Sequence, residues 1–118
     1  MPIYAYSDVG LHHFTDLLHD LYFALPGKDL KPVDGRIHIT FKDEEKIICD
    51  DRISEFEVCV CDVLEVKLDG RPEDCPDPVQ MNKLKYKAKE KTVVFEAVHP
   101  IQIRIKVEKL HLELNQLV

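Results

Sequence analysis

The stretch Ser7–Phe23, SDVGLHHFTDLLHDLYF, is the one segment whose apolar residues recur at helical spacing in a chain that otherwise alternates like strands. At 100° per residue, its apolar side chains fall on one stripe, and its histidines and aspartates fall on the other side. The stripe consists of Leu11, Phe14, Leu17, Leu18, Leu21 and Tyr22. This pattern predicts one amphipathic helix that is buried on one face and packs against the rest of the chain.

The sequence marks the start of this helix more clearly than its end. Ser7 or Asp8 is the expected N-cap, because a short side-chain oxygen there can accept a hydrogen bond from an unpaired backbone N–H. Pro26 and Gly27 end whatever precedes them. Leu21, Phe23 and Leu25 also fall on alternate positions, so these residues could begin a strand.

Beyond a turn-rich loop at residues 26–35, apolar residues alternate with polar ones, which is typical of half-buried strands. The alternating segments are Arg36–Phe41, Glu55–Leu68, Leu84–Ala88, Thr92–Ala97 and Ile101–Leu114, and residues 46–49 are expected to form a hairpin arm after the first. Asp62 stands in phase with the apolar positions, which predicts a bulge or bend with Val63 facing inward, or else a buried, hydrogen-bonded acid. A phase slip between Val107 and Leu110 predicts a second bend.

These elements predict a single α+β domain over residues 1–118. Residues 1–25 supply a short strand and the amphipathic helix, and residues 36–114 supply the β region. We expect a predominantly antiparallel, curved sheet or flattened sandwich of about seven strands, with the helix packed on it.

The charge of the chain is −6 and is unevenly distributed. Residues 1–78 hold 18 acids and 8 bases, whereas residues 79–118 hold 4 acids and 8 bases. An acidic domain is a poor candidate for direct nucleic-acid binding and a better one for binding a basic partner. The lysines at 83, 85, 87 and 89 predict a solvent-facing strand, with an anion-binding face as the alternative.

The chain has no apolar run of the roughly 18 residues that a membrane span requires, and no basic leader, so we expect a cytoplasmic protein without membrane contact. Its four cysteines are then expected to be reduced. Cys59 and Cys61 would lie on the same side of a strand and could form a metal or redox pair if Cys49 or Cys75 came near. The alternative is that they are small core residues.

His12, Asp16 and His19 share one side of the helix and offer ligand types that zinc accepts. Such a set could support a metal-dependent enzyme, although a solvated polar face has the same pattern. No nucleophile motif or glycine-rich phosphate loop is present in the sequence. We therefore expect a non-enzymatic binding protein without a cofactor.

His19-Asp20 precedes an alternating segment, and Phe56-x-Val58-x-Val60 leads into Asp62-Val63-Leu64. In these features, in its size and in its acidic first two thirds, the chain resembles the small cytosolic immunity proteins that protect bacteria from polymorphic or contact-dependent toxins. It implies an inhibitor that binds a cognate, basic toxin domain and covers its active site with acidic residues.

The expected contact residues are acids that cluster in turns and have no evident structural role. They are Asp43, Glu44, Glu45, Asp50, Asp51, Glu73, Asp74 and Asp77. The competing hypothesis is a small adaptor or structural subunit that pairs through an exposed strand edge.

Overall fold

The computed structural model describes residues 3–19, 21–24, 31–42, 55–76 and 78–116. The elements are β1 (Ile3–Ala5), α1 (Asp8–Leu18), β2 (Tyr22–Phe23), β3 (Ile37–Lys42), β4 (Glu55–Val60), β5 (Val63–Gly70), the 3₁₀ turn η2 (Pro72–Asp74), β6 (Val79–Lys87), β7 (Thr92–Ala97), β8 (Ile101–Val107) and β9 (Leu112–Gln116). The predicted α+β class and antiparallel sheet are confirmed. The expected number of about seven strands is wrong, because the residues that the structure describes already form a sheet of nine.

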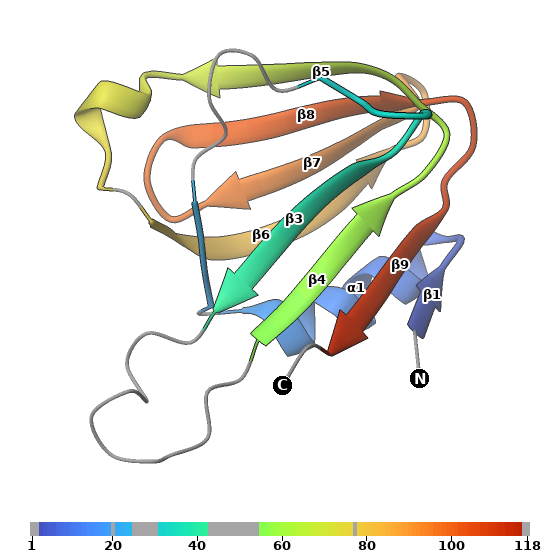
Figure 1. Cartoon of the computed structure of the whole chain (residues 1–118), viewed down its shortest axis with the longest axis horizontal. Coiled ribbons are helices and arrows are strands. Elements are labelled where there is room, and N and C mark those ends of the chain that lie inside the picture. Colours follow the sequence, from blue (N-terminus) through green and yellow to red (C-terminus); the bar gives the residue numbers. More distant parts are fainter. Residues whose placement is uncertain (1–2, 20, 25–30, 43–54, 77, 117–118) are drawn as a thin grey trace.

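The described strands form one continuous hydrogen-bonded sheet, which folds over into two layers (Figure 1). Its strand order is β1-β9-β4-β3-β2-β6-β7-β8-β5, and every pairing is antiparallel. We call β1, β9, β4 and β3 the front layer, and β6, β7, β8 and β5 the back layer. The two-residue strand β2 pairs with β3 on one side and β6 on the other, and so joins the layers.

The core lies between the two layers, where the alternating apolar positions of both meet. Ile37, Ile39 and Phe41 of β3 are buried, as are the corresponding residues of β7 and β8. Phe41 contacts Phe23 of β2 and Phe95 of β7, with ring centroids 5.3 and 6.2 Å apart. Burial of apolar area drives this packing, and the aromatic rings tie the front layer, the junction and the back layer together.

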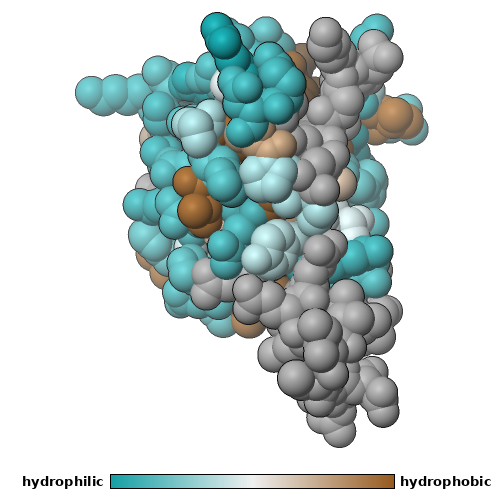
Figure 2. Space-filling model, turned by 90° about the vertical axis from the view of Figure 1, so that its left-hand side faces the viewer, coloured by the Kyte–Doolittle hydropathy of each residue, from teal (hydrophilic) through white to brown (hydrophobic). Residues whose placement is uncertain are grey.

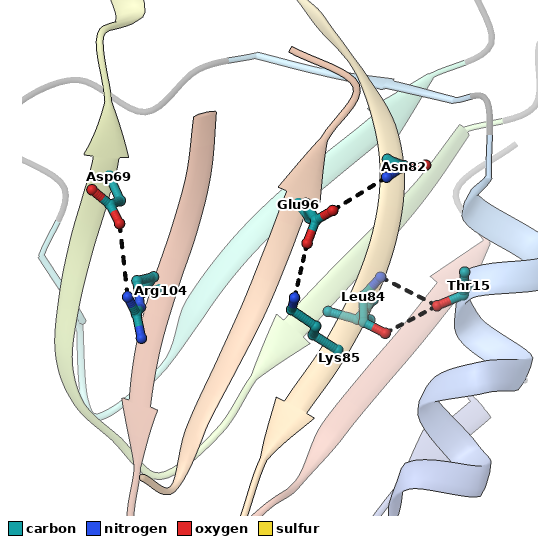
Figure 3. A network of polar contacts seen from close by, with 7 residues as sticks. All are labelled: Thr15, Asp69, Asn82, Leu84, Lys85, Glu96 and Arg104. Carbon is teal, nitrogen blue, oxygen red and sulfur yellow. Dashed lines mark hydrogen bonds and ion pairs between the residues drawn. The ribbon is translucent and has the colours of Figure 1, made fainter. Parts of the chain in front are cut away.

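Helix α1 bridges β1 and β6, so it links the free edge of the front layer to the back layer. Leu11, Phe14 and Leu18 of its apolar stripe are fully buried. On the adjoining side, the Thr15 hydroxyl donates to the Leu84 carbonyl at 3.1 Å and accepts from the Leu84 N–H at 3.2 Å (Figure 3). The helix therefore satisfies both backbone groups of one β6 residue.

The ends of α1 differ from the sequence expectation. The helix stops at Leu18 because His19 has a ψ of 134°, and the following residues enter β2. Ser7 occupies the N-cap with extended backbone angles, but its side chain makes no capping hydrogen bond. The alternative reading of Leu21 onward as the start of a strand is confirmed in the short β2.

Two crossings between layers replace the bends that the alternation predicted. Residues 55–68 form two strands, because Asp62 takes a φ of 54° and the chain passes from β4 in the front layer to β5 in the back layer. Asp62 is exposed and Val63 is buried, as expected. The phase slip after Val107 marks the return crossing from β8 to β9. The expected hairpin arm at 46–49 lies outside the described residues.

Candidate functional site

Most of the acidic residues expected to contact a partner lie outside the described residues. These are Asp43, Glu44, Glu45, Asp50, Asp51 and Asp77. Glu73 and Asp74 are described, and both are exposed on η2 between β5 and β6. η2 is at the left of Figure 1, and the described surface on this side is mainly hydrophilic (Figure 2).

The histidine and aspartate side chains of α1 are the candidate metal ligands. His12 and Asp16 are exposed on the helix, and His19 lies just beyond its end, where its N–H donates to the Thr15 carbonyl. Within the described part of the chain, no group of three or more His, Cys, Asp or Glu side chains is arranged to hold a metal ion. No helix among the described residues is long and apolar enough to span a membrane.

The outer surface of the front layer is mildly acidic. Its strands carry Glu55, Glu57 and Glu113 against a single cation, Lys42, and all four side chains are on outward positions of the register. Lys42 Nζ is 3.9 Å from Glu55 Oε1, which is a long and exposed ion pair. Between these strands, the sequence of residues 43–54 adds five acids and two bases.

A shallow hollow of about 380 Å³ lies where the front layer meets β2. Its lining comprises Tyr22, Ala24, Thr40, Lys42, Glu55 and Pro78. Since both strands that flank residues 43–54 contribute to it, the hollow adjoins the points where that acidic segment leaves and rejoins the sheet.

The outer surface of the back layer is basic. Its strands carry six Lys or Arg residues against three acids, and the β6–β7 turn adds Lys89, Glu90 and Lys91. Some of these charges are paired within the layer: Lys85 Nζ lies 3.0 Å from Glu96 Oε2, and Arg104 contacts Asp69 at 3.7 Å (Figure 3).

The Lys85 hydrogen bond to Glu96 is the main cause that lowers the pKa of that carboxyl group, despite a partial burial that opposes the shift. Asn82 contributes a second hydrogen bond to the same carboxylate at 3.3 Å. In contrast, Lys67, Lys87 and Lys106 make no ion pair with any described residue.

An aromatic group borders the free edge of the front layer. Tyr4 and Tyr6 stack with centroids 6.2 Å apart, and the His111 ring lies 4.9 Å from the Tyr6 ring. Tyr6 is 63% exposed, and Ile3 and Tyr4 beside it are also exposed. Aromatic side chains are enriched at protein interfaces, and this edge has that composition.

A chain of polar contacts runs across β3 and β4 in the same layer. Glu57 Oε1 is 3.1 Å from His38 Nδ1, and His38 Nε2 is 4.0 Å from the sulfur of Cys59. The Cys59 sulfur is in turn 4.0 Å from the sulfur of Cys61. Burial and the neighbouring Cys61 raise the pKa of the Cys59 thiol to about 11, so it is protonated at neutral pH.

The sequence indicated the Cys59–Cys61 pair but not the residue that joins it. Cys49 lies outside the described residues, and Cys75 is partly buried after η2, whereas His38 is directly opposite Cys59 in the β3–β4 register. Strand register is a tertiary property, and the spacing of 21 residues between His38 and Cys59 carries no local signal.

No protein-family model, no curated protein and no solved structure matches this chain.

Proposed function

We propose that this chain is a non-enzymatic protein-binding domain whose front layer docks on a basic partner, in the manner of an immunity-type inhibitor. The observation that supports this proposal is the unequal charge of the two outer surfaces. The front strands carry three glutamates and one lysine, while the back strands carry twice as many bases as acids. A basic partner is attracted to one surface and repelled by the other.

Other features of the front layer fit the same role. The hollow at Tyr22 and Thr40, whose lining includes Lys42 and Glu55, offers a recess in which one side chain of a partner can be held. The exposed Tyr4 and Tyr6 supply apolar contact area at the opposite edge of the layer. Asp43, Glu44, Glu45, Asp50 and Asp51 remain proposed contacts, with Glu73, Asp74 and Asp77 as additional ones.

The test starts with capture from an extract of the source organism, using the immobilised chain as bait. The captured protein is then purified and titrated against three forms of this chain: wild type, Glu55→Lys/Glu113→Lys on the front layer, and Lys67→Glu/Lys87→Glu on the back layer. We expect the front variant to bind at least about tenfold more weakly and the back variant to bind as wild type or better.

The inhibitor part of the proposal has its own measurement. Expression of the captured protein alone is expected to arrest growth, and co-expression of this chain is expected to restore it. An acidic partner, equal binding by the front and back variants, or an affinity that does not change between 0.05 and 0.5 M salt, about a threefold change in Debye length, would refute the proposal.

A second candidate is a small adaptor that pairs through the edge of β1, which the exposed Ile3, Tyr4 and Tyr6 favour. Among the described strands, β1 pairs with β9 alone, so its other edge has backbone groups that an added strand could bind. Sedimentation velocity distinguishes this candidate: a stable homodimer that Tyr4→Lys/Tyr6→Lys dissociates would support it. A concentration-independent monomer with an intact partner complex would exclude it.

A further inference from the structure

The Cys59–Cys61 pair lies outside the role proposed for the front layer and has a defined geometry of its own. Cys59 occupies β4, directly opposite His38 on one side and Glu113 on the other. Cys61 follows the strand, and its N–H donates to the His111 carbonyl at 2.9 Å. Strand pairing and this hydrogen bond therefore fix the backbone of both residues.

The two thiols are close together and nearly inaccessible. Their sulfur atoms are 4.0 Å apart, and Cys59 and Cys61 are 3% and 5% exposed. With a metal ion about 2.3 Å from each sulfur, a typical metal–thiolate distance, the sulfur–metal–sulfur angle would be about 120°. A linear arrangement needs a separation of about 4.6 Å, which is within the reach of small side-chain rotations.

We propose that Cys59 and Cys61 form a binding site for a soft monovalent metal ion, with Cu(I) as the biological candidate. Thiolates select Cu(I) over harder ions, and Cu(I) accepts low coordination numbers. A structural zinc ion takes four ligands, whereas the described residues include no group of three or more suitable side chains. The donor set thus fits an ion that two thiolates can hold.

His38 is the positioning residue of this site. The Glu57 carboxylate accepts from Nδ1–H, so in the neutral ring Nε2 has a free lone pair that faces the Cys59 sulfur at 4.0 Å. Metal binding replaces the proton of each thiol, and Nε2 can accept the proton that leaves Cys59. The two buried thiols therefore lie beside a ring nitrogen that can take up a proton as the metal binds.

The test uses the full chain in which Cys49→Ser and Cys75→Ser leave only the proposed pair. This parent is reduced, kept anaerobic and titrated with Cu(I) in competition with a colorimetric Cu(I) chelator. We expect one Cu(I) per chain, an ultraviolet thiolate-to-copper absorption band, and a higher melting temperature with the metal than without it. Ag(I), which does not cycle between oxidation states here, is expected to bind with the same stoichiometry.

Further substitutions in this parent protein test which residues bind the metal. Cys59→Ser and Cys61→Ala are each expected to abolish the one-to-one step, and His38→Ala is expected to weaken affinity by about 10- to 100-fold. Far-UV circular dichroism of each metal-free variant verifies its fold. Failure of the folded parent to compete for Cu(I), or equal competition by a folded Cys61→Ala variant, would overturn the proposal.

Discussion

The front and back layers share one core but differ in what they present outward. Both layers bury alternating apolar side chains, and most of the remaining side chains lie on the outer face, where Val94 and Cys59 are exceptions that are also buried. In the back layer those outward positions carry lysines and arginines, several of them paired with acids. In the front layer they carry glutamates, a histidine, a thiol and exposed tyrosines at the edge. Core packing constrains only the side chains that point inward, so the outward side chains of the two layers can differ in charge and chemistry.

The largest expected effect comes from breaking the aromatic contact that joins the layers. Phe41→Ala removes a fully buried ring between Phe23 and Phe95 and is expected to lower the free energy of unfolding by about 3–5 kcal/mol. Val94→Ala is the matched control, because Val94 is buried within the back layer alone. Its expected cost is about 1.5 kcal/mol. Equal losses in urea unfolding would mean that the rings do not couple the layers.

Loss of the helix anchor comes next in size. Thr15→Val keeps the shape of the side chain but leaves the Leu84 N–H and carbonyl without their hydroxyl partner. We expect a loss of about 1–3 kcal/mol in the free energy of unfolding, whereas Thr15→Ser should recover most of it. If Thr15→Val and Thr15→Ser unfold at the same denaturant concentration, α1 is held to the back layer by its apolar stripe alone.

A smaller effect is expected from the paired charge of the back layer. The pKa of Glu96 is depressed, so its contribution is fully present above its ordinary pKa of 4.5 and is lost as pH falls through the lower folded value. Because the side chain is partly exposed, Glu96→Gln should cost only about 0.5–1 kcal/mol at pH 7. Thermal unfolding at pH 7 and pH 3 checks the sign, since the difference from wild type should shrink at pH 3.

The smallest effect is expected for the ion pair of the front layer. Lys42 and Glu55 are 3.9 Å apart with the lysine side chain mostly exposed, so Lys42→Gln should change the free energy of unfolding by less than about 0.5 kcal/mol. Urea unfolding of this variant beside Glu96→Gln compares the two layers directly. A larger loss for Lys42→Gln would show that the front surface contributes to stability as well as to binding.

The sequence predicted the helix, the alternation in residues 36–41 and the two interruptions after Val60 and Val107. It did not predict that each interruption is a crossing between layers. Asp62 is in phase with apolar neighbours on both sides, and β4 and β5 face the same core from opposite layers. A bulge and a crossing therefore produce the same pattern of alternation. β2, with two residues, was too short to be distinguished from the end of a helix.

The candidate site was less accessible to sequence reasoning than the fold. The acidic segment stands out in the sequence, but the surface charge of each layer depends on which strands are neighbours. The contact between His38 and Cys59 depends on register in the same way. At the N-cap, the sequence predicted the position but not the interaction: Ser7 precedes the helix, but its side chain makes no capping hydrogen bond.

The two-residue strand β2 is also where the continuity of the ladder is weakest. Among the described strands, β2 is the one that pairs with both layers, through Tyr22 and Phe23, and Leu21 adds one backbone hydrogen bond from Met81. In contrast, β6 and β7 share a long register. The consecutive strands β6, β7 and β8 of the back layer can therefore assemble as local hairpins, whereas the front layer joins β9 to β4 and β1 from distant parts of the chain. We expect the front layer, and with it closure over Phe41, to form later. Amide hydrogen exchange at Tyr22 and Phe23 reports directly on that closing step, independently of the unfolding of either half.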